Sequence, residues 1–200
     1  MKVNFEKKKN IEKIINYFEK SKQIIIDSQT NELYEKILNI SEIIINTIEA
    51  NGMILVCGNG GSASDCSHIF SELMGKFYHI RKPVKIVDLT SNSSFLTAWS
   101  NDVEFNFVFS RQLEAFNDSK NILIAISTSG ESKNILNALQ TAKKYKIKTI
   151  ALTGGAKGKM LDYSDLSLEV PSKNTPIIQQ VHLIIYHIIC ALIEERLLDE

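Results

Sequence analysis

Apolar residues at helical spacing dominate the first fifty positions and predict two helices, roughly Phe5–Ile26 and Asn31–Ala50. Asn31 is the expected N-cap of the second helix, because an asparagine side chain can accept from the first free backbone N–H groups. The apolar positions that define this second helix include Leu33, Ile37, Ile44 and Ile48.

After Asn51-Gly52 the pattern changes to short, wholly apolar runs separated by helical stretches. The runs predict strands at Met53–Cys57, Val84–Leu89, Ile122–Ile126, Thr149–Leu152 and Leu166–Val170. Helices are expected at Ser62–Tyr78, in a broken region from Ser93 to Phe116, at Ser132–Tyr145, briefly near Lys157–Tyr163, and at Thr175–Leu198. Strands that are apolar throughout, joined by crossover helices, indicate a five-stranded parallel sheet covered on both faces. We therefore expect one α/β domain over residues 1–200, with residues 1–51 as a helical segment and 52–200 as the core.

Composition narrows the choice of partners. Lys+Arg and Asp+Glu both number 23, so the net charge is zero and favours neither nucleic acid nor an anionic membrane. The three cysteines show no CxxC spacing, which suggests a reducing, cytoplasmic setting. The most apolar stretch, about Val181–Ile193, is expected to be too short to span a bilayer.

A glycine-rich loop, Gly58–Ala63, joins the first predicted strand to a helix. Such a loop at a helix start offers backbone N–H groups and a positive dipole end to an anion. His68 and Glu72 follow at i, i+4, on one helix face, where they can act on one substrate or one metal. The alternative is a plain surface ion pair worth a few tenths of a kcal/mol.

The second loop, Ser127–Ser132, follows the strongest predicted strand and precedes another helix. Its hydroxyls can donate to phosphate oxygens, although one serine would suffice for an ordinary N-cap. Both loops lie at carboxyl ends of strands, where ligands bind in parallel sheets. Together they favour a phosphate site and an enzyme acting on a phosphorylated small molecule.

Two nucleotide motifs are also considered. Gly58–Ala63 fits G-x-G-x-x-A, and Asp88 ends the next strand, as in a dinucleotide site. Against this interpretation, the spacing from Ala63 to Asp88 is long, and His68 and Glu72 would have no role in such a site. Gly158-Lys159 is followed by Met160, so a Walker A motif is absent.

The last predicted helix is apolar but carries Gln179, Gln180, His182 and His187. A buried, hydrogen-bonded histidine remains an alternative for His182, whereas His187, among isoleucines, most needs a functional explanation. Gln179 and His187 are eight residues apart, about 12 Å along a helix. We therefore expect a pocket close to a subunit interface, where different subunits can supply different groups.

These motifs together resemble the sugar isomerase (SIS) domain family and, within it, the phosphoheptose isomerases, over nearly the whole chain. The matching residues are Gly58-Asn59-Gly60-Gly61-Ser62-Ala63, His68 and Glu72, Asn101-Asp102, Ser127-Thr128-Ser129-Gly130, and Ile178-Gln179 with His182 and His187.

The resemblance implies a tetrameric, Rossmann-like α/β fold and conversion of sedoheptulose 7-phosphate to D-glycero-D-manno-heptose 7-phosphate through a cis-enediol. It implies Glu72 and His187 as the catalytic pair and one Zn²⁺ per subunit. The implied zinc ligands are His68, Glu72, Gln179 and His187. The implied substrate contacts are Asn59, Gly60, Gly61, Ser62, Asn101, Asp102, Ser127, Thr128, Ser129, Ser132 and Gln179.

The chain departs from the family pattern at Ile177, Gln180 and Ser91-Asn92, and Pro176 opens the last helix. These changes remove charges near the expected pocket. Two other functions therefore stay open: a non-catalytic phosphosugar-binding protein of the replication-initiator-associating type, and an isomerase of another sugar phosphate. Retention of Glu72 and His187 favours an enzyme.

Overall fold

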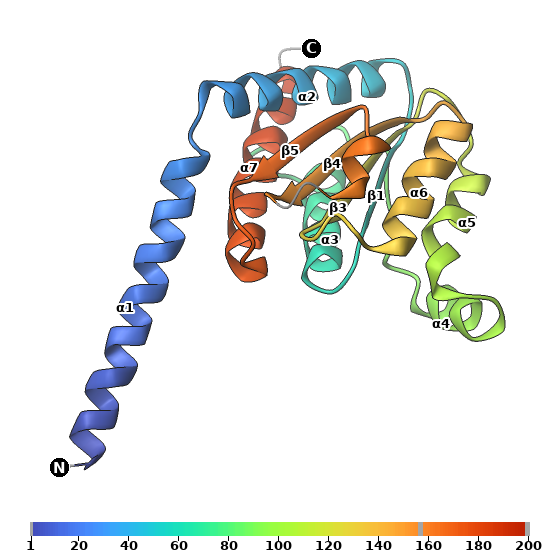
Figure 1. The fold of residues 1–200 in the computed structure, drawn as a ribbon. Helices are drawn as coiled ribbons and strands as arrows, with labels where there is room; N and C mark the ends of the chain where they lie inside the picture. Colours follow the sequence, from blue (N-terminus) through green and yellow to red (C-terminus); the bar gives the residue numbers. More distant parts are fainter. Residues whose placement is uncertain (1, 156–157, 199–200) are drawn as a thin grey trace.

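The computed structural model describes residues 2–155 and 158–198, with side chains from residue 6 onward. Two helices, α1 (Lys2–Ser28) and α2 (Asn31–Glu49), precede the α/β core (Figure 1). The core's strands are β1 (Ile54–Gly58), β2 (Ile86–Asp88), β3 (Ile122–Ser127), β4 (Lys148–Gly154) and β5 (Leu166–Val170). Its helices are α3 (Gly61–Met74), α4 (Ser93–Asp102), α5 (Val108–Ala115), α6 (Lys133–Lys144) and α7 (Thr175–Leu198), with short 3-10 turns at Phe105–Phe107 and Lys159–Asp162.

The strands form one parallel sheet in the order β2-β1-β3-β4-β5, which confirms the predicted five-stranded α/β fold. The order reverses between β1 and β3, and ligands of such sheets bind at that switch point, beyond the carboxyl ends of the strands. Gly58 pairs with Ile126 in the register, so β1 and β3 end nearly level. The two loops of interest therefore leave the sheet side by side.

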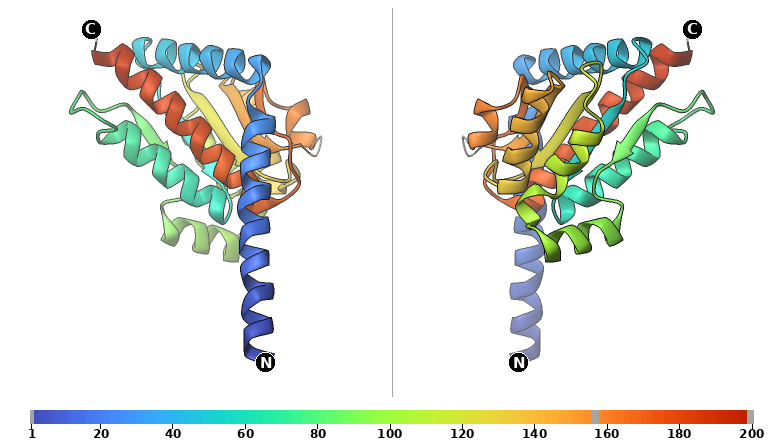
Figure 2. Two further views of the ribbon diagram at one scale, coloured as in Figure 1. Left: turned by 90° about the vertical axis from the view of Figure 1, so that its left-hand side faces the viewer. Right: turned by 90° about the vertical axis from the view of Figure 1, so that its right-hand side faces the viewer.

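Helices cover both faces of the sheet (Figure 2). Ile54 and Val56 join a core formed with α2, α3 and α7, while Leu55 and Cys57 point into a second core formed with α5 and α6. Alternate strand residues thus serve opposite cores, which explains why the strands are apolar throughout. Cys57, Cys66 and Cys190 are buried free thiols.

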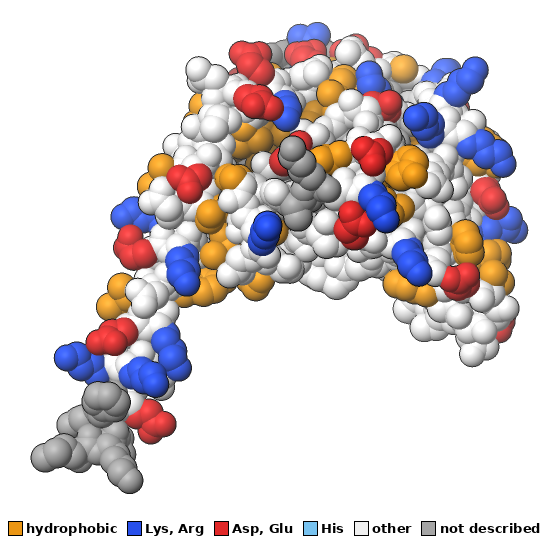
Figure 3. Space-filling model, viewed as in Figure 1, with side chains coloured by type: hydrophobic (Ala, Val, Ile, Leu, Met, Phe, Trp, Pro, Cys, Tyr) orange, Lys and Arg blue, Asp and Glu red, His pale blue; other side chains and the backbone are white. Residues whose placement is uncertain are grey.

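Helix α1 extends away from the α/β body in both side views (Figure 2). Apolar side chains lie along it among lysines and glutamates (Figure 3). Its large exposed apolar side chains are Ile11, Ile14, Ile15, Tyr17, Phe18 and Ile26. A helix this exposed gains little from burial within its own chain, so this surface is available for contact with another molecule.

Several predicted boundaries need correction. Thr30, not Asn31, caps α2, because its hydroxyl accepts from the Leu33 N–H at 3.1 Å. Helix α3 ends at Met74 rather than Tyr78, where Gly75 interrupts it, and β2 is limited to Ile86–Asp88. The short helical piece is found at Lys159–Asp162; its predicted start at Lys157 lies outside the described residues.

The expectation that the last helix is too short to span a bilayer is wrong. Helix α7 has 24 residues and is the one described helix long and apolar enough to do so by length and composition. Half of its most apolar window is buried, and its residues Ile178, Val181 and Ile185 lie in the core beside the sheet. A core position accounts for the apolar composition.

Candidate active site

Helices α3 and α7 pack side by side and run in the same direction with a constant offset. Gly61 lies against the Gln179 side chain, so close that a Cβ on residue 61 would stand 2.3 Å from Gln179 Nε2. Seven residues further along each helix, the Tyr186 hydroxyl lies 3.0 Å from His68 Nδ1. This parallel register places the start of α7 at the glycine loop and its middle beside His68.

Three side chains converge where α3 meets the middle of α7. His68 Nε2 is 3.1 Å from Glu72 Oε1 and 3.3 Å from His187 Nε2. One possible ligand atom from each residue lies within 4.8 Å of the others. The side chains of His68 and Glu72 are 40% and 18% exposed, so the cluster can be reached from solvent.

The donor set suits a metal ion. Two imidazoles and one carboxylate direct lone-pair-bearing atoms at a common point, and zinc takes nitrogen and oxygen ligands of this kind. Without a cation between them, a carboxylate oxygen and two ring nitrogens at these distances would repel unless a proton intervened. Burial and the neighbouring His68 lower the pKa of His187, and Glu72 opposes them with a smaller raising effect. The lowered pKa favours the neutral imidazole, which is the form that binds a metal. Within the described residues, this group could hold a divalent metal.

Gln179 lies apart from this group. It contacts Gly61 at the start of α3, whereas His187 contacts His68 two turns further on. The predicted distance of about 12 Å between the two positions along the helix is consistent with this placement. Membership of Gln179 in the metal set stays a prediction.

An amide pair joins the two loops across the switch point. Asn59, in the loop after β1, and Asn134, in the first turn of α6, exchange hydrogen bonds of 2.9 Å and 2.8 Å. Asn134 is 3% exposed, so the pair is largely shielded from water. Gly60 has a φ of 57°, a conformation that favours glycine, and it places Asn59 to make this bridge. The two loops are therefore tied together at the carboxyl ends of β1 and β3.

The hydroxyl groups of the second loop gather at the start of α6. Ser127 Oγ lies 3.2 Å from Ser132 Oγ and 3.5 Å from Ser129 Oγ. Thr128 Oγ1 lies 3.5 Å from Thr175 Oγ1, at the first residue of α7. Helix α7 thus begins beside the hydroxyl cluster and then passes the glycine loop and the three metal-binding candidates.

Asn101 and Asp102 are not brought to these two loops by any hydrogen bond in the described part of the chain. Both are exposed at the end of α4, and Asn101 Nδ2 donates to Asp102 Oδ1 at 2.9 Å. Their predicted contact with substrate remains a prediction.

The alternatives raised by the sequence are resolved by local bonding. Asp88 Oδ1 accepts hydrogen bonds from the Thr90 N–H and hydroxyl, and Asp88 Oδ2 accepts one from the Ser67 hydroxyl. Both carboxylate oxygens are therefore already engaged, whereas a dinucleotide ribose would need them. His182 is fully buried and its Nε2 donates to the Thr153 carbonyl at 3.2 Å. Burial lowers the pKa of His182 to about 4. It is a neutral core histidine.

The departures from the family pattern also take local roles. Ile177 is 2% exposed in the core, where a charged side chain would be costly. Gln180 Nε2 donates to the Tyr17 hydroxyl at 3.3 Å and so ties α7 to α1. Asn92 caps α4 by accepting from the Phe95 N–H at 2.9 Å.

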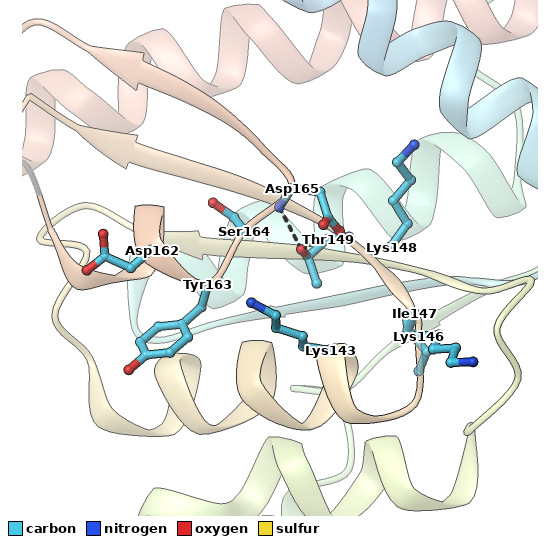
Figure 4. A pocket seen from close by; sticks show the side chains of 9 residues that line it. All are labelled: Lys143, Lys146, Ile147, Lys148, Thr149, Asp162, Tyr163, Ser164 and Asp165. Carbon is cyan, nitrogen blue, oxygen red and sulfur yellow. Dashed lines mark hydrogen bonds between the residues drawn. The ribbon is translucent and has the colours of Figure 1, made fainter.

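A separate cavity of about 320 Å³ lies near the opposite end of the strands, beside the start of β4 (Figure 4). Its lining includes three lysines, but Lys146 and Lys148 point away from Lys143 (Figure 4). Asp165 in the lining is engaged by the N–H and hydroxyl of Thr149 at 2.8 and 2.9 Å. The charged groups therefore do not converge on a ligand.

Four residues beside the site escaped the sequence analysis: Asp65, Arg81, Tyr186 and Glu194. Asp65 precedes His68 by three positions on α3, which would have placed it on the same helix face. It is 8% exposed, and burial raises its pKa to about 6, against the lowering effects of Tyr186 and His68. Contacts between distant parts of the chain, such as Arg81 with Glu194, leave no local pattern.

Comparison with known proteins identifies the family of this chain. The SIS domain family model matches residues 16–154. A phosphoheptose isomerase of Helicobacter pylori (strain P12) is 45% identical over 164 residues, covering 82% of this chain and 85% of the relative. One from Clostridium acetobutylicum is 40% identical over 182 residues, 91% of each chain. The solved structure of a phosphoheptose isomerase from Francisella tularensis gives a TM-score of 0.89 at 36% identity, covering 93% of this chain and 98% of that one. The chain belongs to the SIS domain family and, within it, to the phosphoheptose isomerases.

Proposed function

We propose that this protein is an aldose–ketose isomerase that converts D-sedoheptulose 7-phosphate to D-glycero-D-manno-heptose 7-phosphate through a cis-enediol. The observation that carries the proposal is the convergence of His68, Glu72 and His187 at the junction of α3 and α7. The product would enter the synthesis of nucleotide-activated heptose for surface polysaccharide or capsule.

The catalytic pair in this proposal is Glu72 and His187. Isomerisation moves a proton between adjacent carbons and another between the attached oxygens. The Glu72 carboxylate would take the carbon-bound proton, and the His187 imidazole, whose pKa burial lowers, would serve the oxygens. Both residues contribute to one partly exposed cluster, so a sugar end placed there meets both.

We infer that Zn²⁺ binds through His68, Glu72, Gln179 and His187, with one ion per subunit. Such an ion supplies Lewis-acid stabilisation of negative charge developing on the sugar oxygens. His68 would orient the sugar end, and Gln179 would link the metal region to the glycine loop that it contacts. A Glu72 carboxylate that ligates the metal is a weaker free base, so base and ligand roles compete at this residue.

The phosphate is proposed to bind the hydroxyls of Ser127, Thr128, Ser129 and Ser132 at the N-terminus of α6. Ser127 Oγ lies 3.2 Å from Ser132 Oγ and 3.5 Å from Ser129 Oγ, and this grouping with the helix dipole behind it suits an anion with several oxygens. Asn59, Gly60, Gly61 and Ser62 would line the sugar chain, with Asn101 and Asp102 holding hydroxyls. The bridge between Asn59 and Asn134 supports a single crevice for both loops.

We further propose a homotetramer whose pockets lie near subunit interfaces. His187 is flanked on α7 by Ile184 and Ile188, which are 36% and 43% exposed. These isoleucines and the apolar side chains of α1 would be covered by neighbouring subunits. We propose that the chain is a single domain that acts in the cytoplasm. Its proposed partners include neither nucleic acid nor a membrane.

A coupled assay on sedoheptulose 7-phosphate tests the function. Turnover of this ketose and not of five- or six-carbon sugar phosphates is the expected result. Turnover of a shorter sugar phosphate alone would favour an isomerase of another substrate. Saturable binding of a sugar phosphate without turnover, in metal-loaded protein, would favour the non-catalytic binding protein.

A further inference from the structure

We propose that Tyr186 is a positioning residue that accepts the Nδ1 hydrogen of His68, so that His68 presents an unprotonated Nε2 toward Glu72 and His187. The geometry places the Tyr186 hydroxyl at His68 Nδ1. The choice of tautomer rests on the zinc site proposed above, because a metal at Nε2 requires that nitrogen to be unprotonated.

The contact between the two residues is well defined. The Tyr186 hydroxyl lies 3.0 Å from His68 Nδ1, and the rings meet edge to face with centroids 5.5 Å apart. Tyr186 is 3% exposed, so water cannot readily replace the hydroxyl. A neutral imidazole carries one hydrogen, so a hydrogen on Nδ1 leaves Nε2 free to bind a metal.

Asp65 is the proposed acceptor for the hydroxyl hydrogen of Tyr186. A phenol that accepts from His68 needs an acceptor for its own O–H. This role falls to the buried Asp65 carboxyl, whose pKa is raised by burial and lowered to a smaller extent by the nearby Tyr186. Asp65 Oδ2 has no hydrogen-bond partner in the described part of the chain, so the carboxyl has acceptor capacity to spare. The resulting order is His68 Nδ1–H to Tyr186, and Tyr186 O–H to Asp65.

The competing arrangement places the hydrogen on His68 Nε2, donating to Glu72 Oε1 at 3.1 Å. A metal at the cluster excludes that arrangement, because Nε2 must then be unprotonated. The displaced hydrogen resides on Nδ1 and requires an acceptor, which Tyr186 provides. Metal-bound histidines commonly donate their other ring N–H in this way. Helix α7 thus contributes one metal-binding candidate, His187, and orients another on α3.

The test compares zinc affinity of wild type and Tyr186→Phe by competition with a chromophoric chelator, without substrate. Loss of the hydroxyl should weaken zinc binding by about 10–100-fold. Tyr34→Phe, at a tyrosine on α2 that is 47% exposed, is the matched control and should bind as wild type. Unchanged affinity in Tyr186→Phe would overturn the proposal.

Two further measurements separate positioning from a general effect on folding. Asp65→Asn should also weaken zinc binding, and should add little in the Tyr186→Phe background, because its effect passes through the hydroxyl. Fully additive losses would contradict the relay. Nitrogen-15 NMR of the zinc-loaded protein should show a hydrogen on His68 Nδ1 and zinc on Nε2; the reverse would refute it. A wild type that binds no zinc would also refute it, while leaving the isomerase assay to stand by itself.

Discussion

The Glu194 carboxylate and the Arg81 guanidinium face each other inside the protein, with Oε1 and Nε 3.6 Å apart and both side chains 2% exposed. Glu194 also accepts the backbone N–H groups of Phe77, Tyr78 and His79 at 2.7–3.1 Å. Arg81 Nη2 in turn donates to the Glu72 carbonyl at 2.7 Å. The pair therefore fastens the segment after α3 to α7 and holds the end of the helix that carries Glu72.

Replacing Glu194 by Gln should destabilise the protein by about 3–5 kcal/mol, because it leaves the Arg81 charge buried without a counter-charge. Urea unfolding measures this loss. Glu195→Gln, at the exposed neighbouring position, is the control and should lie within about 0.5 kcal/mol of wild type. Equal stability of the two variants would show that the buried pair has no structural role.

The amide pair between Asn59 and Asn134 predicts coupled effects on the two loops. Each alanine variant should lose about 1–3 kcal/mol, since the remaining amide is left partly unpaired away from water. The double variant should lose clearly less than the sum of the two. Urea unfolding of the four proteins in the cycle gives the coupling energy. Simple additivity would mean that the bridge does not join the loops in solution.

The sheet and its order of helices and strands were predictable because each strand faces two cores and is apolar throughout. Leu55 and Val56 serve opposite cores, so a continuous apolar run is the only pattern that satisfies both. The glycine-rich and serine-rich loops at strand ends likewise indicate the edge of the sheet at which a ligand would bind. The cap of α2 was misplaced by one residue, because Thr30 and Asn31 are both good capping residues and only the backbone distinguishes them.

The support around the site was not predictable. Arg81 and Glu194 are separated by more than a hundred positions, and neither lies in a motif. In the sequence, Tyr186 is one of several large side chains in an apolar helix. Only the parallel register of α3 and α7 brings its hydroxyl to His68. The contrast between His182 and His187 depends equally on the packing: one faces the Thr153 carbonyl in the core, the other faces α3.

His182 predicts a loss of stability in mild acid. Its pKa is about 4 in the folded protein, below the ordinary value of 6.5, so the unfolded chain takes up a proton that the folded chain refuses. The contribution of the neutral side chain is complete above about pH 6.5, and about 3 kcal/mol is lost as the pH falls toward 4.

Unfolding free energies of wild type and His182→Gln, measured at steps of about 0.5 pH unit from about pH 7.5 to about pH 4, test this prediction. The variant should show a shallower decline, since glutamine does not titrate. His79→Gln, at an exposed histidine, should retain the slope of wild type. A wild-type slope in His182→Gln would mean that other groups cause the acid loss.

The hydroxyl cluster predicts a substrate-binding defect. Ser129→Ala should raise KM for the sugar phosphate several-fold, because a donor to the phosphate is lost, while kcat changes less. Ser119→Ala, at an exposed serine before β3, is the control and should keep both constants. An unchanged KM in Ser129→Ala would remove this hydroxyl from the phosphate site.

Deuterium transfer from solvent tests the assignment of Glu72 and His187 most directly. In D₂O, the wild type should place deuterium on the carbon that gains a proton during isomerisation. Glu72→Gln should reduce the rates of turnover and of deuterium exchange by about 10²–10⁴-fold. His187→Gln should reduce the rate of turnover by a similar factor. Zinc content and unfolding free energy are measured in parallel, so that a lost ion or fold is recognised. Wild-type exchange and turnover in both variants would contradict the assignment of these two residues to catalysis.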